Sequence, residues 1–144
     1  MLTDAQLDDL RLKYGKIGVI DAEGHQIVFR KPTRDNAREY RRQRESETEK
    51  HLAMESLAQL TIVAFDGELD VNKARTIYTS SFLDEFPFFI NRPSVMGTLS
   101  VLGGMVESED AVDMGKGVRV LSARQNPTPV VSPNGSPIAP EVPS

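Results

Sequence analysis

The sequence predicts an α+β fold: a small, mostly helical single domain with one N-terminal β-hairpin and an extended, proline-rich C-terminal tail. Apolar residues recur at helical spacing through much of the chain, and two β-rich runs flank a turn near residues 17–29. Six of the nine prolines fall in the last twenty residues. We therefore expect a helical domain at 1–106 with its hairpin at about 16–31, a linker or short strand at 107–124, and the tail at 125–144.

The composition narrows the classes of protein to which the chain can belong. It has 144 residues, 39% of them hydrophobic, with a net charge of −4 and a sequence pI near 5.2. A negative molecule is repelled by polyanions, so any binding to DNA or RNA would have to be local to a basic stretch. The chain has no cysteine, which excludes disulfides, thiolate zinc sites and cysteine nucleophiles and fits a reducing cytoplasm.

The sequence carries no targeting or membrane signal. Its first ten residues, MLTDAQLDDL, contain early acids and lack the basic-then-apolar order of a signal peptide. The longest uncharged apolar stretch, residues 94–106, is well short of the roughly 20 residues that cross a bilayer. We expect a soluble intracellular protein that makes no contact with a membrane.

A helix, a hairpin and a second helix are predicted in that order at the N-terminus. Thr3 is placed to cap a short amphipathic helix that stops at Gly15. Residues 17–20 and 27–29 are β-rich and flank Asp and Gly, which predicts the hairpin. Thr33 then precedes a run of strong helix formers with an acid in the first turn, so we expect it to cap a charged helix.

The charged helix is expected to continue into a leucine-rich half. Between Arg41 and His51 no side chain is apolar, whereas from Leu52 onward leucine and alanine recur at helical spacing. The first half should therefore be solvated or contact a polar partner, and the second half should pack in the core. The β-branched run at residues 60–65 should end as an extended segment.

The remaining elements are marked by turn residues and prolines. Asp66-Gly67 is a turn signal, and helical spacing follows it until Pro87. Pro93 opens a third short helix that ends at Gly103-Gly104. Residues 117–124 form a possible short strand beyond it.

A dense set of basic side chains lies on the charged helix. Arg34, Arg38, Arg41 and Arg42 share one side of it, an arrangement that can follow a phosphate backbone. Glutamates interleave with them and supply partners at helical spacing, such as Glu45 for Arg41. The interleaving favours a solvated or protein-facing helix over a nucleic-acid-binding one, which stays open as the less favoured alternative.

No arrangement of side chains in the sequence predicts catalysis or a bound metal. The acids of DGELD alternate as in a calcium loop, but Val71 stands where glycine is required and Ile77 where glutamate is required. Glu47, His51 and Glu55 would share one helical face able to hold a metal, yet such a stripe is far more often solvated. We expect no enzyme activity, no cofactor and no metal site.

Four stretches stand in a recognisable order along the chain. They are Phe29-Arg30-Lys31-Pro32-Thr33 at the strand-to-helix turn, the helix end with Leu57 and Leu60, Phe86-Pro87, and the close at Leu102-Gly103-Gly104. Over residues 1 to about 106, this order resembles that of the tail assembly chaperones of tailed bacteriophages. The segment from Met105 to Ser144 is longer and richer in proline than that family's pattern requires.

The resemblance implies a non-enzymatic late protein of virion morphogenesis that acts in the host cytoplasm. It would bind the hydrophobic tape-measure protein and help to recruit tail-tube subunits. Such a binder needs a helical scaffold with apolar contacts and a charged outer face. The candidate contacts are Phe82, Phe86, Phe88, Phe89, Met96, Arg34, Arg38 and Arg41. Each apolar candidate could instead belong to the core, because a chain with six phenylalanines needs most of them inside.

Two other functions stay open at the level of sequence. The protein could be a structural subunit of the virion, in the baseplate or neck, held there by its proline-rich tail. It could also be a nucleic-acid-binding protein that uses the arginines of the charged helix. The oligomeric state is open as well, so self-association is a further possibility.

Overall fold

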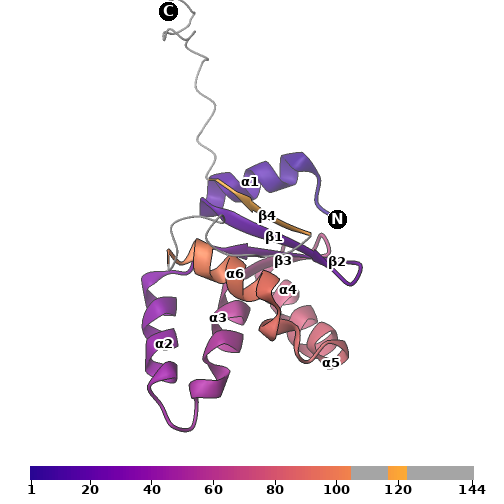
Figure 1. The fold of residues 1–144 in the computed structure, drawn as a ribbon. Helices are drawn as coiled ribbons and strands as arrows, with labels where there is room; N and C mark the ends of the chain where they lie inside the picture. Colours follow the sequence, from indigo (N-terminus) through magenta and orange to yellow (C-terminus); the bar gives the residue numbers. More distant parts are fainter. Residues whose placement is uncertain (105–116, 123–144) are drawn as a thin grey trace, which may run out of the picture.

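An antiparallel β-sheet with helices on both faces forms the centre of the molecule (Figure 1). The computed structural model describes residues 1–104 and 117–122. The strands are β1 (Ile17–Ala22), β2 (His25–Arg30), β3 (Ile62–Phe65) and β4 (Val118–Leu121). The helices are α1 (Asp4–Tyr14), α2 (Arg34–Arg44), η1 (Lys50–Leu52), α3 (Ala53–Thr61), α4 (Val71–Ile77), η2 (Tyr78–Phe82), α5 (Leu83–Glu85), η3 (Phe89–Asn91) and α6 (Pro93–Leu102). The fold is a mostly helical α+β domain, as the sequence predicts.

Strands β1 and β2 form the predicted hairpin with a shorter turn than expected. Their register pairs Ala22 with His25, which leaves only Glu23 and Gly24 between the strands. Both turn residues have positive φ, 55° at Glu23 and 78° at Gly24. A two-residue turn with positive φ at both positions matches the right-handed twist of the strands that it joins. The strands therefore extend to the edges of the turn, beyond the apolar runs that mark them in the sequence.

The hairpin is the middle of a larger sheet, with the strand order β3-β2-β1-β4. Strand β3 pairs with β2, and Ile27 lies opposite Phe65. Strand β4 pairs with β1, and Ile20 lies opposite Val118. The short strand expected beyond α6 is thus an edge strand of this sheet. The predicted tail at 125–144 lies outside the described residues.

The charged segment and the leucine-rich segment form two helices, and the prediction of one continuous helix is wrong. Helix α2 ends at Arg44, the chain turns back, and α3 runs beside α2 in the opposite direction (Figure 1). In the connection, Ser46 Oγ accepts hydrogen bonds of 3.3 Å from the backbone N–H groups of Thr48 and Glu49. These local bonds compete with helix continuation. The two helices together form a helical hairpin.

Apolar side chains fill the space on both faces of the sheet. One face packs against α3, α4 and α6 and forms the larger cluster, with Ile20, Phe29, Ile62, Ala74, Tyr78, Phe82, Phe89, Val95 and Leu99 among its buried members. The other face packs against α1 through a smaller cluster, with Leu7, Leu10, Ile17, Val19 and Val28 among its members. Because neighbouring residues of a strand point to opposite faces, the two clusters draw on alternate positions of β1 and β2. The molecule is thus a sheet between two helical layers.

Aromatic rings dominate the larger cluster. The Phe82 ring lies 4.7 Å from the Phe89 ring and 5.4 Å from the Phe65 ring, centroid to centroid, in edge-to-face geometry. Tyr78 stacks on Phe82 at 5.9 Å. Burial raises the pKa of the Tyr78 hydroxyl above its usual value, and the nearby Glu55 carboxylate raises it further. The prediction that helical spacing continues from residue 71 towards Pro87 is confirmed, although the turn at Tyr78–Phe82 is a π-helix.

We expect the substitution Thr33→Ala to lower the free energy of unfolding by about 1 kcal/mol, since it removes a helix cap. Thr33 Oγ1 accepts a hydrogen bond from Asn36 N–H at 3.1 Å, and Asn36 Oδ1 accepts one from Thr33 N–H at 3.0 Å. A urea titration measures the loss. The variant Thr33→Ser keeps the hydroxyl and should stay close to the parent; an equal loss in both variants would show that the cap does not stabilise α2.

Candidate functional site

The five arginines of α2 fall into two groups. Two of them form ion pairs: Arg38 Nη1 lies 2.9 Å from Asp35 Oδ1, and Arg42 Nη2 lies 2.6 Å from Glu39 Oε2. Arg42 also reaches Glu49 Oε1, at 2.8 Å. The other three have no ion-pair partner among residues 1–104 and 117–122; they are Arg34, Arg41 and Arg44.

The carboxylates of this region are held by Arg42. Hydrogen bonds from its guanidinium lower the pKa of Glu39 and that of Glu49 below their usual values. The pair expected between Arg41 and Glu45 does not form among the described contacts, although the Glu45 N–H group still bonds to the Arg41 carbonyl at the end of α2. Both carboxylates of α2, Asp35 and Glu39, are therefore paired with Arg38 and Arg42 and leave the other arginines of the helix without an ion pair among the described residues.

The unpaired arginines lie on a single face of α2. Arg34, Ala37, Arg41 and Arg44 are spaced by three, four and three residues, which places them along one helical stripe. Asp35 and Glu39 fall outside this stripe. We call Arg34, Arg41 and Arg44 the basic face of α2. All three side chains are exposed.

A groove of about 300 Å³ runs beside the basic face. Its lining residues come from α2, from α3 and from the end of α6: Pro32, Ala37, Tyr40, Arg41, Leu57 and Gly103. We call it the α2–α6 groove. The Tyr40 hydroxyl accepts a hydrogen bond of 2.7 Å from Arg44 Nη1, which ties this lining residue to the basic face. The groove is thus mostly apolar, with arginine at its edge.

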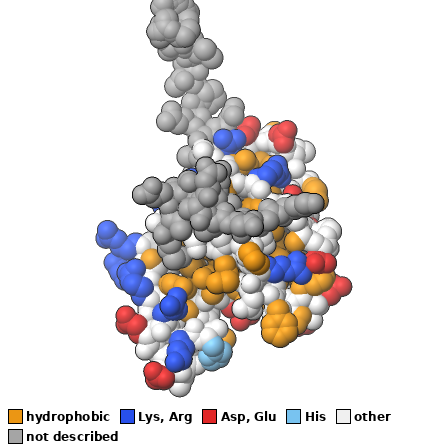
Figure 2. Space-filling model, in the orientation of Figure 1, with side chains coloured by type: hydrophobic (Ala, Val, Ile, Leu, Met, Phe, Trp, Pro, Cys, Tyr) orange, Lys and Arg blue, Asp and Glu red, His pale blue; other side chains and the backbone are white. Residues whose placement is uncertain are grey.

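The apolar surface continues from the groove along α6. Met96 and Gly103 are seven residues apart, so they share one face of that helix. The Met96 side chain is 42% exposed. Figure 2 shows hydrophobic side chains in the middle of this side of the molecule and lysine and arginine side chains on the side where α2 lies. An apolar strip beside a positive edge is the main feature of this surface.

The four candidate phenylalanines occupy different environments. Phe82 and Phe89 are 3% and 1% exposed and belong to the larger core cluster, the alternative that the sequence left open for them. Phe86 is half-buried against the same cluster. Phe88 is 79% exposed and points away from the core. Of the aromatic candidates, only Phe88 is freely available to a partner.

Arg92 fixes the segment that presents Phe88. Its guanidinium lies over the rings of Phe89, at 5.2 Å, and Phe86, at 5.8 Å. It also pairs with Glu23 at the tip of the hairpin, with 2.9 Å between Nη2 and Oε2. These contacts hold the turn between α5 and α6 against the β1–β2 hairpin. The backbone that carries the exposed Phe88 side chain is therefore fixed in place.

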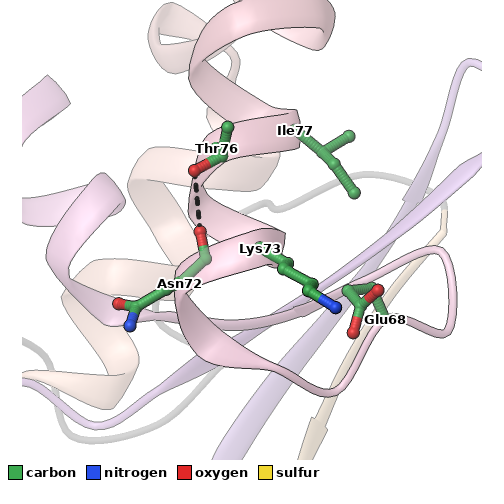
Figure 3. Close-up of a pocket in the computed structure, with 5 residues that line it drawn as sticks. All are labelled: Glu68, Asn72, Lys73, Thr76 and Ile77. Carbon is green, nitrogen blue, oxygen red and sulfur yellow. Dashed lines mark hydrogen bonds between the residues drawn. The ribbon is translucent and has the colours of Figure 1, made fainter.

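A second hollow, of about 360 Å³, lies on α4 and is open to solvent (Figure 3). Its lining residues are Glu68, Asn72, Lys73, Thr76 and Ile77. The Thr76 hydroxyl donates a hydrogen bond of 2.9 Å to the Asn72 carbonyl, and Lys73 extends toward Glu68 (Figure 3). The Thr76 hydroxyl is thus bonded to the backbone of its own helix, and the two charged side chains, Lys73 and Glu68, lie at the surface. This hollow holds no base aimed at a nucleophile.

Glu47, His51 and Glu55 do not share one helical face, although their spacing in the sequence would allow it. Glu47 lies in the turn after α2, His51 in η1 and Glu55 in α3, because the continuous helix that would align them is interrupted. Within residues 1–104 and 117–122, no three His, Asp or Glu side chains are grouped so that they could hold a metal ion.

Sequence reasoning identified Arg34, Arg41 and Met96 but missed Arg44 and the groove. The third candidate arginine, Arg38, is paired with Asp35. Pro32, Ala37 and Tyr40 come from one segment, whereas Leu57 and Gly103 come from two others that are distant in the sequence. The available signal was the stripe at Arg34, Ala37, Arg41 and Arg44, where one small residue stands among arginines. Only the packing of three helices shows that this small residue borders a groove.

The chain matches no family model, no curated protein and no solved structure in comparisons with known proteins. Among the described residues, no helix is both long enough and apolar enough to cross a membrane. The function must therefore be inferred from the chain's own residues and from their arrangement.

Proposed function

We propose that this protein is a non-enzymatic tail assembly chaperone of a bacteriophage, which binds the tape-measure protein and helps to recruit tail-tube subunits. The order of its segments supports this function by its resemblance to that family. The observation that carries the proposal is the α2–α6 groove, an apolar depression with a charged edge on a helical scaffold. Grooves of this kind accept the apolar face of an amphipathic helix.

The size of the apolar surface suits a partner that is bound for a limited time. The groove and the neighbouring Met96 form one small apolar strip, and Phe88 is an exposed apolar side chain apart from it. Lysine and arginine side chains lie beside the strip, on the side of α2 (Figure 2). Small interfaces with polar rims are typical of transient complexes, whereas permanent ones bury larger and more apolar areas. A chaperone must release its partner when the tail tube forms, so a surface of this kind fits the proposed role.

Co-expression with fragments of the tape-measure protein, followed by affinity purification, tests the proposal. The expected result is co-purification of at least one fragment, lost in the variant Ala37→Glu, which places a bulky charge in the groove. The variant Asn72→Glu adds the same charge on the α4 surface and should keep the fragment. If no tail protein is retained by the parent chain, the chaperone function is wrong.

Analysis of purified particles separates the chaperone from a virion subunit. A chaperone is expected to be missing from the mature particle, because the tail tube replaces it on the tape-measure protein. Mass spectrometry that finds the chain in a fixed ratio to other virion proteins would instead identify a structural subunit and overturn the proposal.

A further inference from the structure

We infer that the segment bound in the α2–α6 groove is an acidic amphipathic helix, with apolar side chains on the groove floor and carboxylates against the basic face of α2. This inference rests on the proposed function, because it specifies the partner of the same site. The partner segment has aliphatic residues on one stripe of its helix and glutamate or aspartate along the adjoining stripe.

The charge of the rim favours acids on the partner. Arg34, Arg41 and Arg44 carry positive charge with no ion-pair partner among the described residues, while the nearby carboxylates of Asp35 and Glu39 are occupied by Arg38 and Arg42. An arriving carboxylate therefore meets guanidinium groups without displacing an existing ion pair. Complementary charge of this kind selects partners and accelerates their encounter.

The dimensions of the basic face fit a helix lying along α2. Arg34 and Arg44 are ten residues apart, which is about 15 Å along the helix axis at 1.5 Å per residue. A partner helix of about three turns would span that length. Its acids would face the three arginines while its apolar stripe turns toward Ala37 and Leu57. Gly103 lines the groove where α6 ends, and because it has no side chain it takes up little of the space there.

The apolar floor favours a protein partner over a nucleic acid. Ala37, Leu57 and Pro32 offer no donor to a phosphate, and burying their surface needs an apolar group on the partner. The net charge of −4 also repels a polyanion outside this one face. An extended phosphate backbone would gain the arginine contacts but leave the groove empty.

Fluorescence anisotropy with two labelled synthetic peptides of about 15 residues tests the inference. The first peptide has leucine on one helical stripe and glutamate along the adjoining stripe, and the second has lysine in place of each glutamate. The full-length chain is expected to bind the glutamate peptide at least about tenfold more tightly than the lysine peptide, with affinity falling as salt rises. Equal affinity for the two peptides, or binding of neither, would overturn the inference.

Matched variants locate the site. The variant R34Q/R41Q/R44Q is expected to bind the glutamate peptide about tenfold more weakly than the parent, since each exposed pair contributes a small and roughly additive amount. The control K13Q/K16Q/K73Q has the same change in net charge away from the groove and should bind as the parent does. Equal losses in the two variants would show a general charge effect and contradict the proposed site. Circular dichroism of both variants checks that they are folded.

Other occupants of the groove give distinct outcomes, each of which would overturn the inference. Tighter binding of labelled single-stranded RNA than of the glutamate peptide would indicate a nucleic-acid site. Peptide binding that begins only when the acids at 107, 109, 110 and 113 are replaced by their amides would indicate that the chain's own residues compete for the groove. Peptide binding that requires dissociation of a dimer would indicate a second copy.

The peptide test and the tape-measure test can reject the acidic helix and the proposed function independently of each other. Retention of a tape-measure fragment by both the parent and R34Q/R41Q/R44Q would keep the proposed function and reject the acidic helix. Binding of the glutamate peptide without retention of any tail protein would keep the acidic helix and reject the tape-measure protein as its source.

Discussion

Replacement of Phe89 with alanine is expected to lower the free energy of unfolding by about 3–5 kcal/mol. The ring is 1% exposed and meets the rings of Phe82 and Tyr78 at 4.7 and 6.4 Å. Truncation removes these contacts and leaves a cavity that the surrounding sheet and helices cannot close fully. Urea unfolding followed by circular dichroism measures the loss.

The neighbouring residue provides a matched control for this substitution. Phe88 is 79% exposed, so Phe88→Ala should change the free energy of unfolding by less than about 0.5 kcal/mol. The two substitutions delete the same atoms at adjacent positions. Similar losses in both variants would contradict the assignment of one ring to the core and the other to the surface.

The substitution Gly18→Ala is expected to cost about 1–3 kcal/mol, the range typical of an overpacked core. A Cβ atom at Gly18 would lie 2.3 Å from Thr98 Cγ2 and 3.2 Å from Leu102 Cδ1. Both neighbours belong to α6, which packs against β1 at this point. The helix would have to move away from the sheet, and Gly103 at its end lines the α2–α6 groove. We therefore expect weaker partner binding as well as lower stability.

A second substitution relieves the clash at Gly18 and tests its cause. Thr98→Ala removes the methyl group that the new Cβ would meet, so the double variant Gly18→Ala/Thr98→Ala should be more stable than the sum of the single effects predicts. A double-mutant cycle by urea titration measures this coupling. Strict additivity would show that the loss at Gly18 does not come from contact with α6.

Local signals account for most of the elements that the sequence predicts correctly. Thr3 and Thr33 both form capping boxes at the starts of α1 and α2, as their types and positions indicate. Asp66 and Gly67 have φ of 50° and 89°, the positive values that a tight turn requires. Pro93 begins α6 as expected. Each of these features depends on a few neighbouring residues, so a single sequence is enough to find it.

The helix break after Arg44 was missed although a local signal for it exists. Ser46 and Glu49 have the spacing of a capping box, and Ser46 Oγ does accept a hydrogen bond from Glu49 N–H. The uninterrupted run of charged helix formers outweighed this signal in the prediction. Helix propensity is weak per residue, and the packing of α3 against the sheet decides where the chain turns.

The sheet and the groove depend on contacts that no local pattern shows. Strands β3 and β4 join the hairpin from distant parts of the chain, and the groove combines segments around Ala37, Leu57 and Gly103. Contacts between distant segments also decide which candidate phenylalanines are buried. The composition requires that most phenylalanines be buried but does not identify which of them are. Burial is decided by tertiary packing.

Hydrogen exchange of the full-length chain, with and without a bound tape-measure fragment, tests most directly whether the α2–α6 groove is the partner-binding surface. Binding is expected to slow exchange in residues 34–44 and 96–103, with little change in α4. Slower exchange confined to α4, or to the turn that carries Phe88, would place the partner elsewhere and contradict the assignment of the groove.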